Sequence, residues 1–192
     1  MRARPFGCLF EIVETLVLTV IIFLVIQTFV AQPYRVEQQS MQRTLEDGQY
    51  VLVDKLTPRF DDYSRGDIVV FRPRDAATDA TPYIKRVIGV AGDTVEIRSG
   101  RVMVNGEPLA ERYVFDGQPT NAGADRARWT VRDGELFVLG DHRSNSRDSR
   151  QLDTVPVDNV VGRAWLRYWP IERLGVLETP RYAEASPASG RP

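Results

Sequence analysis

Apolar residues form one long stretch near the start of the chain and short runs separated by polar turns after it. Between residues 9 and 31 the only charged side chains are Glu11 and Glu14, near the beginning of the stretch. About 20 apolar residues at 1.5 Å rise per residue cover the roughly 30 Å hydrocarbon core of a bilayer. The pattern predicts a transmembrane anchor over residues 9–31, preceded by a short N-terminal segment, residues 1–8.

A cleaved secretory signal and a buried helix of a soluble protein are the two other interpretations of this stretch. A secretory signal usually has an apolar region of only about 7–15 residues and small side chains before the cleavage point. Here Phe29-Val30-Ala31 places a bulky ring where a small side chain is needed, so a retained anchor is favoured. Arg2 and Arg4 precede the anchor, which predicts a cytoplasmic N-terminus by the positive-inside rule.

Beyond Pro33, short β-branched runs alternate with glycine turns, which predicts a mostly β domain over residues 32–177. Ser99-Gly100 and Asn105-Gly106 are signals for tight hairpins. The expected strands are residues 50–54, 67–71, 83–90, 94–98, 101–104, 135–139 and 160–168.

Three further segments are polar and lack the strand pattern. Residues 73–82 and 116–128 are predicted to be loops. Residues 178–192 contain Pro, Ala, Ser and Gly with few apolar side chains to pack, so a disordered tail is predicted.

Composition narrows the possible functions. About 145 residues between the anchor and the tail are enough for one single-core domain. The formal charge of −1 provides no basic field for a nucleic-acid partner. Cys8 is the only cysteine and His142 the only histidine, which excludes a disulfide within the chain and a metal centre of His and Cys ligands. We expect neither a metal nor another cofactor.

Lys85 is the most unusual candidate for chemistry. It is one of two lysines, beside Lys55, and it lies in the apolar run Tyr83–Ile88. A lysine desolvated among apolar neighbours can lose its proton near neutral pH and act as a base, whereas an arginine cannot. Ser40, just beyond the anchor, offers a hydroxyl for such a base. Taken singly, these residues also fit a lysine at a strand edge and a serine in a linker.

A dense polar segment, Gly140–Arg150, follows the apolar run Leu136–Leu139. Taken alone it could be an ordinary surface loop. Together, the anchor, Ser40, Lys85 and this segment suggest a serine/lysine hydrolase tethered to a membrane.

Four motifs in order resemble those of bacterial type I signal peptidases, from the anchor to about Tyr168. They are Ser40-Met41 with Thr44-Leu45, Gly66–Phe71, Tyr83–Gly89 with Gly92-Asp93, and Gly140-Asp141 with Arg143, Asn145-Ser146 and Asp148-Ser149-Arg150. The resemblance implies an antiparallel β catalytic domain close to the outer surface of the cytoplasmic membrane. It also implies an endopeptidase that removes signal peptides from exported preproteins, with the preproteins and the lipid bilayer as its partners.

The same resemblance implies roles for individual residues. Ser40 matches the nucleophile and Lys85 its general base, acting through an acyl-enzyme. Ser146 matches a serine that orients the lysine amine, and Asp148 and Arg150 match a charged pair that supports the site. Four further residues match positions lining an apolar cleft for small substrate side chains at −1 and −3: Met41, Leu45, Tyr83 and Ile84.

The segment around Ser40 departs from the family pattern Pro-Ser-Gly-Ser-Met-x-Pro-Thr-Leu. This chain has Glu37-Gln38-Gln39 before Ser40 and Arg43 after it, so both prolines are absent. The Gln38 amide replaces a hydroxyl that helps stabilise the oxyanion in many members, and the Ser40 N–H offers a second donor. His142 stands where Asn is common, and we interpret it as a structural replacement.

Three other functions fit parts of this sequence. A Ser-His-Asp hydrolase using Asp141 and His142 lacks a Gly-x-Ser-x-Gly elbow, and its two partners are adjacent in the chain. A self-cleaving repressor of the Ser/Lys type would need a DNA-binding domain instead of an anchor. A non-catalytic β domain that binds or assembles other proteins is the main alternative, although the presence of both Ser40 and Lys85 argues against it.

Overall fold

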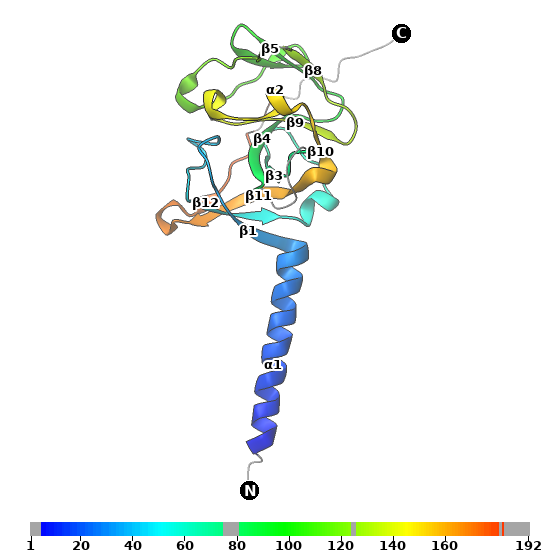
Figure 1. Ribbon diagram of the computed structural model, residues 1–192, viewed down its shortest axis with the longest axis vertical. Coiled ribbons are helices and arrows are strands. Elements are labelled where there is room, and N and C mark those ends of the chain that lie inside the picture. The colour runs from blue at the N-terminus through cyan, green and yellow to red at the C-terminus, as the bar shows by residue number, and fades with distance from the viewer. Residues whose placement is uncertain (1–4, 75–80, 124–125, 181, 183–192) are drawn as a thin grey trace.

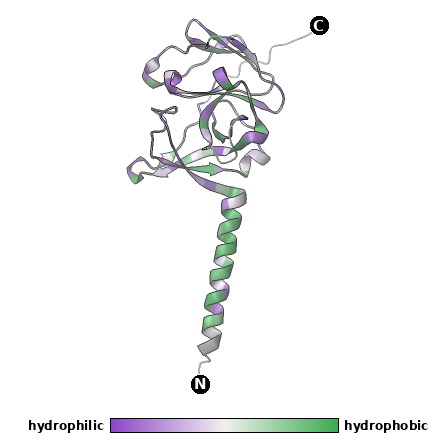
Figure 2. Cartoon of the chain, in the orientation of Figure 1, coloured by the Kyte–Doolittle hydropathy of each residue, from purple (hydrophilic) through white to green (hydrophobic). Residues whose placement is uncertain are grey.

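The computed structural model describes residues 5–74, 81–123, 126–180 and 182. Helix α1 (Pro5–Val25) continues as a π-helical turn, η1 (Ile26–Val30), and projects from a β domain (Figure 1). The span Leu9–Val30 has a mean hydropathy of 2.6, and none of it is buried against the domain (Figure 2). The helix is therefore long and apolar enough to cross a membrane, as the sequence predicts.

The larger sheet has eight antiparallel strands. They follow the order β1-β2-β11-β3-β4-β9-β10, and β12 pairs with β11. Their bounds are β1 Ala31–Arg35, β2 Tyr50–Asp54, β3 Ile68–Phe71, β4 Tyr83–Gly89, β9 Glu135–Leu139, β10 Val155–Pro156, β11 Val160–Trp169 and β12 Gly175–Val176. This sheet lies at the end of the domain that carries α1 (Figure 1).

The smaller sheet has four antiparallel strands in the order β7-β6-β5-β8 and lies at the end away from the anchor (Figure 1). Its strands are β5 Thr94–Arg98, β6 Arg101–Val104, β7 Glu107–Pro108 and β8 Arg128–Thr130. The turns Ser99-Gly100 and Asn105-Gly106 have positive φ at both residues, as tight hairpin turns require. Both predicted hairpins are confirmed.

Short helical turns connect the strands. They are η2 Thr57–Arg59, η3 Phe115–Gly117, η4 Arg143–Asn145, α2 Ser149–Leu152, η5 Val157–Asn159 and η6 Ile171–Arg173. Asp148 caps α2, since its side chain accepts from the backbone of Arg150 while the Gln151 side chain accepts from the Asp148 N–H.

The predicted antiparallel β fold is confirmed, and all seven predicted strands are present with ends that differ by at most one residue. The short strands β1, β7, β8, β10 and β12 were not predicted. Strand β1 contains Pro33, which argues against an interior strand, but β1 lies at the edge of its sheet, where proline is tolerated. Of the predicted loop 73–82, residues 75–80 lie outside the described residues.

Strand β4 lies in the centre of the larger sheet, between β3 and β9. Its residues Val87 and Ile88 point to opposite faces, and both are fully buried in separate apolar clusters. Both faces of β4 are therefore covered. For this reason the two charged residues on the same strand, Lys85 and Arg86, are each only 1 % exposed.

Candidate active site

Ser40 and Lys85, which are 45 residues apart in the sequence, meet in the interior. The Lys85 Nζ donates to Ser40 Oγ over 2.7 Å and to the backbone oxygen of Ile84 over 3.0 Å. Ser40 is 4 % exposed and Lys85 1 %. A hydroxyl this close to a buried amine lies within the distance at which a general base takes a proton.

Burial lowers the pKa of Lys85 from 10.5 to about 8. The nearby carboxylates of Asp148 and Asp141 oppose this change, because negative charge favours the ammonium form, but desolvation is the larger effect. The ring of Tyr83 lies 5.2 Å from the amine and covers it on one side. Lys85 can therefore exist as a neutral amine at mildly alkaline pH, which a base must do.

The turn that carries Ser40 is held in an uncommon backbone conformation. Gln38 and Arg43 have φ values of 98° and 84°. Proline is locked near −65° and cannot adopt the conformation of Arg43, which is a physical reason for the missing second proline. The Gln38 side chain is exposed, and its backbone N–H donates to Asp47 Oδ1 over 3.0 Å. Within the described residues the Ser40 N–H has no hydrogen-bond acceptor.

Asp148 organises the segment that follows β9. Its carboxylate accepts from the Gly140 N–H at 3.0 Å, from Ser146 Oγ at 2.7 Å and from Arg150 Nε at 2.8 Å. Asp148 and Arg150 thus form a buried ion pair. In the described part of the chain no hydrogen bond joins Ser146 to Lys85. The Ser146 hydroxyl is directed to Asp148 instead, unlike the lysine contact that the resemblance implies.

Gly140 allows the segment after β9 to approach the nucleophile closely. A Cβ atom at this position would lie 2.2 Å from Ser146 Oγ and 2.6 Å from the backbone oxygen of Ser40. That oxygen also accepts from the His142 N–H at 3.0 Å. Ser146 and Ser40 are therefore packed against the same glycine, and the position of one constrains the other.

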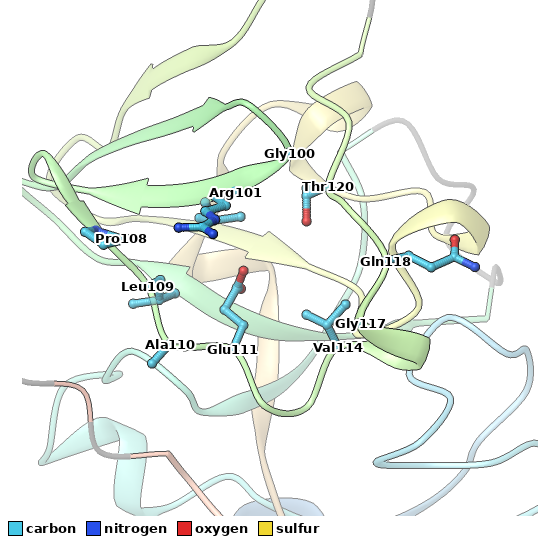
Figure 3. Close-up of a pocket in the computed structure, with 11 residues that line it drawn as sticks. Gly100, Arg101, Pro108, Leu109, Ala110, Glu111, Val114, Gly117, Gln118 and Thr120 are labelled. Atoms are coloured by element: carbon cyan, nitrogen blue, oxygen red, sulfur yellow. The ribbon is translucent and has the colours of Figure 1, made fainter.

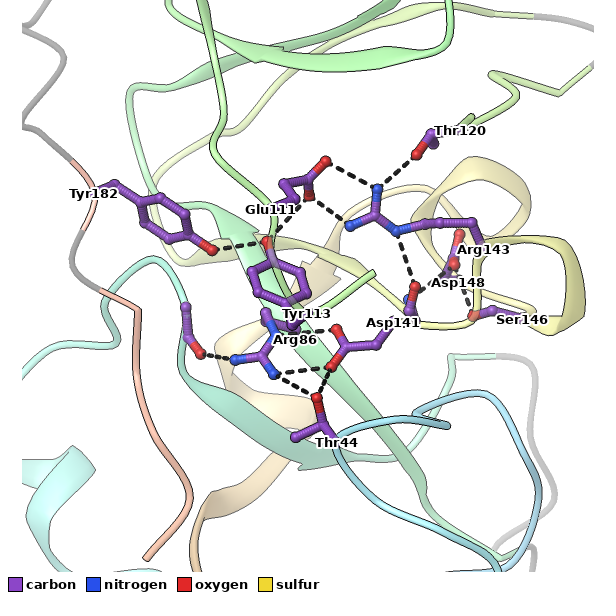
Figure 4. Close-up of polar contacts among 12 residues, drawn as sticks. Thr44, Arg86, Glu111, Tyr113, Thr120, Asp141, Arg143, Ser146, Asp148 and Tyr182 are labelled. Atoms are coloured by element: carbon purple, nitrogen blue, oxygen red, sulfur yellow. Dashed lines mark hydrogen bonds and ion pairs between the residues drawn. The ribbon is translucent and has the colours of Figure 1, made fainter. Parts of the chain in front are cut away.

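Sequence analysis missed a buried network around Arg86, the neighbour of Lys85 on β4 (Figure 4). Arg86 donates to Asp141 through Nε at 3.0 Å and through Nη2 at 2.8 Å. Thr44 Oγ1 donates to the same carboxylate. The network joins β4 to the turn of Ser40 and to the segment after β9. The available signal was a pair of adjacent charges, Lys85 and Arg86, inside the apolar run Tyr83–Ile88.

The residues predicted to line a substrate cleft lie at two depths. Met41 and Leu45 are 0 % exposed and belong to the apolar cluster that includes residues of β2, β3 and β11. Tyr83 and Ile84 are partly buried and retain accessible surface. Met41 and Leu45 therefore lie beneath the surface layer to which Tyr83 and Ile84 contribute.

The geometry opposes a Ser-His-Asp relay. The carboxylate of Asp141 is occupied by Arg86 and Thr44. The ring of His142 lies against Phe115, with centroids 4.4 Å apart, and its buried Nδ1 has no hydrogen-bond partner among the described residues. In the described part of the chain, no group of three or more His, Cys, Asp or Glu residues is placed to hold a metal ion.

Two cavities lie beside the network and not over the Ser40–Lys85 pair. One of about 360 Å³ lies between β6 and the segment 108–120, with Arg101, Glu111 and Thr120 in its wall (Figure 3). The other, of about 330 Å³, has Ser146 and Arg150 in its wall. Neither is lined by Ser40 or Lys85.

Known proteins are similar to this chain in sequence over most of its length. The family described as signal peptidase, peptidase S26, matches residues 9–169. A signal peptidase I from Leptolyngbya laminosa is 40 % identical over 177 residues, which cover 90 % of this chain and 85 % of that protein. A probable signal peptidase I-2 from Synechocystis sp. is 37 % identical over 187 residues, covering 96 % and 84 %.

A solved structure, that of a signal peptidase I from Enterococcus faecalis V583, is 31 % identical with a TM-score of 0.45, covering 54 % of this chain and 97 % of that chain. The match of the family to 161 residues, together with relatives 40 % and 37 % identical over nearly the whole sequence, settles the family. The chain belongs to the signal peptidase family, peptidase S26.

Proposed function

We propose that the chain is a type I signal peptidase that removes signal peptides from exported preproteins, with Ser40 as nucleophile and Lys85 as general base. The observation that carries the proposal is the 2.7 Å hydrogen bond between Lys85 Nζ and Ser40 Oγ in a site from which water is largely excluded. The lowered pKa of Lys85 supports it, because the amine can be neutral when the hydroxyl attacks.

In the proposed reaction, neutral Lys85 takes the Ser40 proton while Oγ bonds to the scissile carbonyl carbon. The ammonium then gives this proton to the leaving amine as the C–N bond breaks, which leaves an acyl-enzyme on Ser40. Lys85 next takes a proton from a water molecule that attacks the ester, and returns it to Ser40 Oγ as the acyl group departs as a carboxylic acid, which then loses its remaining proton to solvent.

The oxyanion of each tetrahedral intermediate needs donors. The Ser40 N–H has no acceptor in the described structure and is the first candidate. The exposed Gln38 amide is the second. A Gln38→Ala variant should acylate at least about tenfold more slowly, since removal of one such donor typically costs 10²–10³ in rate. A wild-type acylation rate in single-turnover kinetics would leave the backbone donor acting alone.

The remaining predicted residues support this site in the proposal. Tyr83 and Ile84 contact the small −1 and −3 side chains, and Met41 and Leu45 form the layer beneath them. Asp148 and Arg150 hold Ser146 and Gly140 in place.

Cleavage of a preprotein by the purified full-length chain in detergent tests the proposed function. The substrate carries Ala at −1 and −3, and mass spectrometry of the product locates the cut. The wild-type chain should cleave after the −1 Ala, whereas Ser40→Ala should leave the preprotein intact. An intact preprotein after incubation with folded wild-type chain would contradict the proposal and favour the non-catalytic alternative.

We propose further that the N-terminus is cytoplasmic and the β domain lies outside the cytoplasmic membrane. Arg2 and Arg4 at the start of the chain support this orientation. The β11–β12 hairpin, with exposed Trp169 and Leu174, lies at the anchor end of the domain (Figure 1), as expected beside a bilayer.

Protease added to intact spheroplasts should therefore cut the exposed part of the segment 116–128 and leave a membrane-bound N-terminal fragment. Immunoblotting of the membrane fraction measures this fragment. Protection in intact spheroplasts, followed by digestion after lysis, would place the domain on the cytoplasmic side.

A further inference from the structure

Leu177, the last residue of the predicted domain, is buried, and the described residues after it, which the sequence assigns to a disordered tail, also pack on the domain. Leu177 is 8 % exposed, lies in the apolar cluster of Met41 and Leu45, and donates its N–H to the Trp165 oxygen at 2.8 Å. The Thr179 hydroxyl donates to Asp67 Oδ1 at 3.3 Å. We call residues 177–180 and 182 the strap. Residues 181 and 183–192 of the predicted disordered tail lie outside the described residues.

The strap packs on the backbone of Gly66. A Cβ atom built on Gly66 would lie 3.0 Å from both Cδ and the backbone oxygen of Pro180, and Gly66 itself has a φ of 95°. The Gly66 carbonyl accepts from Arg86 Nη1 at 2.8 Å. The strap therefore presses on a peptide that holds the Arg86 guanidinium.

Tyr182 is connected to the same guanidinium through Tyr113 (Figure 4). Its hydroxyl donates to the Tyr113 hydroxyl at 2.7 Å, and the Tyr113 ring lies 4.1 Å from the Arg86 guanidinium carbon. The Tyr113 hydroxyl in turn donates to Glu111 at 3.0 Å. Burial raises the pKa of Tyr182 to about 12 and that of Tyr113 well above its usual value, so both stay protonated donors at mildly alkaline pH.

From these contacts two paths lead to the Ser40–Lys85 pair. Arg86 is adjacent to Lys85 on β4 and binds Asp141, which also accepts from Thr44 in the Ser40 turn. Glu111 pairs with Arg143, whose Nε donates to the Gly140 carbonyl at 2.9 Å. Gly140 is the residue against which the backbone of Ser40 packs.

We propose that the strap keeps Ser40 Oγ and Lys85 Nζ within hydrogen-bond distance of each other, with Tyr182 as the positioning residue. Tyr182 acts through Tyr113 on Arg86 and Glu111. Pro180 acts through Gly66 on Arg86. The proposal rests on the proposed function in so far as that function makes the Ser40–Lys85 geometry productive. A buried guanidinium that loses contacting groups is destabilised. A strap that detaches from the domain should therefore let water reach Arg86 and make β4 more mobile.

Tyr182→Phe and Tyr182→Ala in the full-length chain test the proposal, with Tyr168→Phe as the control. The Tyr168 hydroxyl makes no hydrogen bond among the described residues, so its removal should change nothing. Tyr182→Phe should lower kcat for preprotein cleavage about three- to tenfold, the factor that one lost hydrogen bond corresponds to. Tyr182→Ala should lower it further, and KM should be unchanged because the strap lies behind the site.

A second measurement does not depend on activity. The chain has only two lysines, so ¹³C labelling at the lysine Cε gives NMR signals from Lys55 and Lys85 alone. Lys85 should titrate near pH 8 in the wild type, where the charges acting on it are Asp148 and Asp141. In Tyr182→Ala its midpoint should rise by about one pH unit or more as water enters, while Lys55 stays unchanged.

The outcomes separate the two proposals. A folded Tyr182→Ala with wild-type kcat and an unmoved Lys85 midpoint overturns the positioning role, even if its melting temperature falls. A raised Lys85 midpoint in a chain whose wild type leaves preprotein intact supports the strap and overturns the proposed function instead.

Discussion

Replacing Lys85 by arginine should abolish preprotein processing while the chain remains folded. The guanidinium keeps the positive charge but cannot deprotonate, so the Ser40 hydroxyl loses the base to which it is hydrogen-bonded. A positioned general base typically contributes about 10²–10⁴ in rate, and kcat should fall by at least that factor. Single-turnover cleavage of a preprotein by the purified chain measures the loss.

Lys55→Arg is the matched control. The Lys55 amine donates to the Thr28 oxygen at 2.7 Å, where the anchor meets the domain, and only its charge and hydrogen bond are needed there. This variant should process preprotein at close to the wild-type rate. Near wild-type processing by Lys85→Arg would remove Lys85 from the mechanism.

The acylation rate should also depend on pH through Lys85. Because burial lowers its pKa to about 8, the rate should rise through pH 8 and level off above it. Below pH 8 the folded chain holds a desolvated ammonium, and this penalty disappears as pH rises from 8 to 10.5. Lys85→Met should therefore be inactive yet more stable at pH 6, by up to about 3 kcal/mol.

The sequence predicts the anchor and the longer strands because each has its own local signal. The anchor is a continuous apolar stretch, and the strands β2, β5, β6 and β9 are short runs rich in apolar residues with turn residues beside them. Strand β1 escaped prediction because Pro33 argues against a strand, and only its place at the sheet edge makes proline acceptable. Two-residue strands such as β12 have no local pattern to detect.

In the candidate site, too, the sequence identifies individual residues but not the contacts between distant segments. Ser40 and Lys85 could be selected by residue type and by the family resemblance, but their 2.7 Å contact depends on long-range packing across 45 residues. The ion pair of Arg86 and Asp141 spans 55 residues, and its burial follows from the covering of both faces of β4. Tyr182 was assigned to a disordered tail because the polar, proline-rich composition of the segment does not reveal that one tyrosine in it packs on the domain.

Replacing Gly140 by alanine should lower kcat strongly, and a higher substrate concentration should not restore the rate. Its φ is outside the left-handed region, so the backbone accepts alanine, but the new methyl group would lie 2.2 Å from Ser146 Oγ and 2.6 Å from the Ser40 oxygen. One of these groups must move. A displacement of about 1 Å at reacting atoms costs roughly 10² in rate, so kcat should fall by at least that factor.

Two other glycines distinguish a displaced nucleophile from general destabilisation. Gly175→Ala meets only the Arg173 oxygen at 4.0 Å and should be tolerated. Gly162→Ala meets the Asp54 oxygen at 2.2 Å, so it should lower the melting temperature yet leave the kcat of the folded fraction unchanged. Gly140→Ala should instead lose kcat even at temperatures where circular dichroism shows it folded. Equal kcat values for folded Gly140→Ala and Gly162→Ala would mean that the contact between Gly140 and Ser40 does not position the nucleophile.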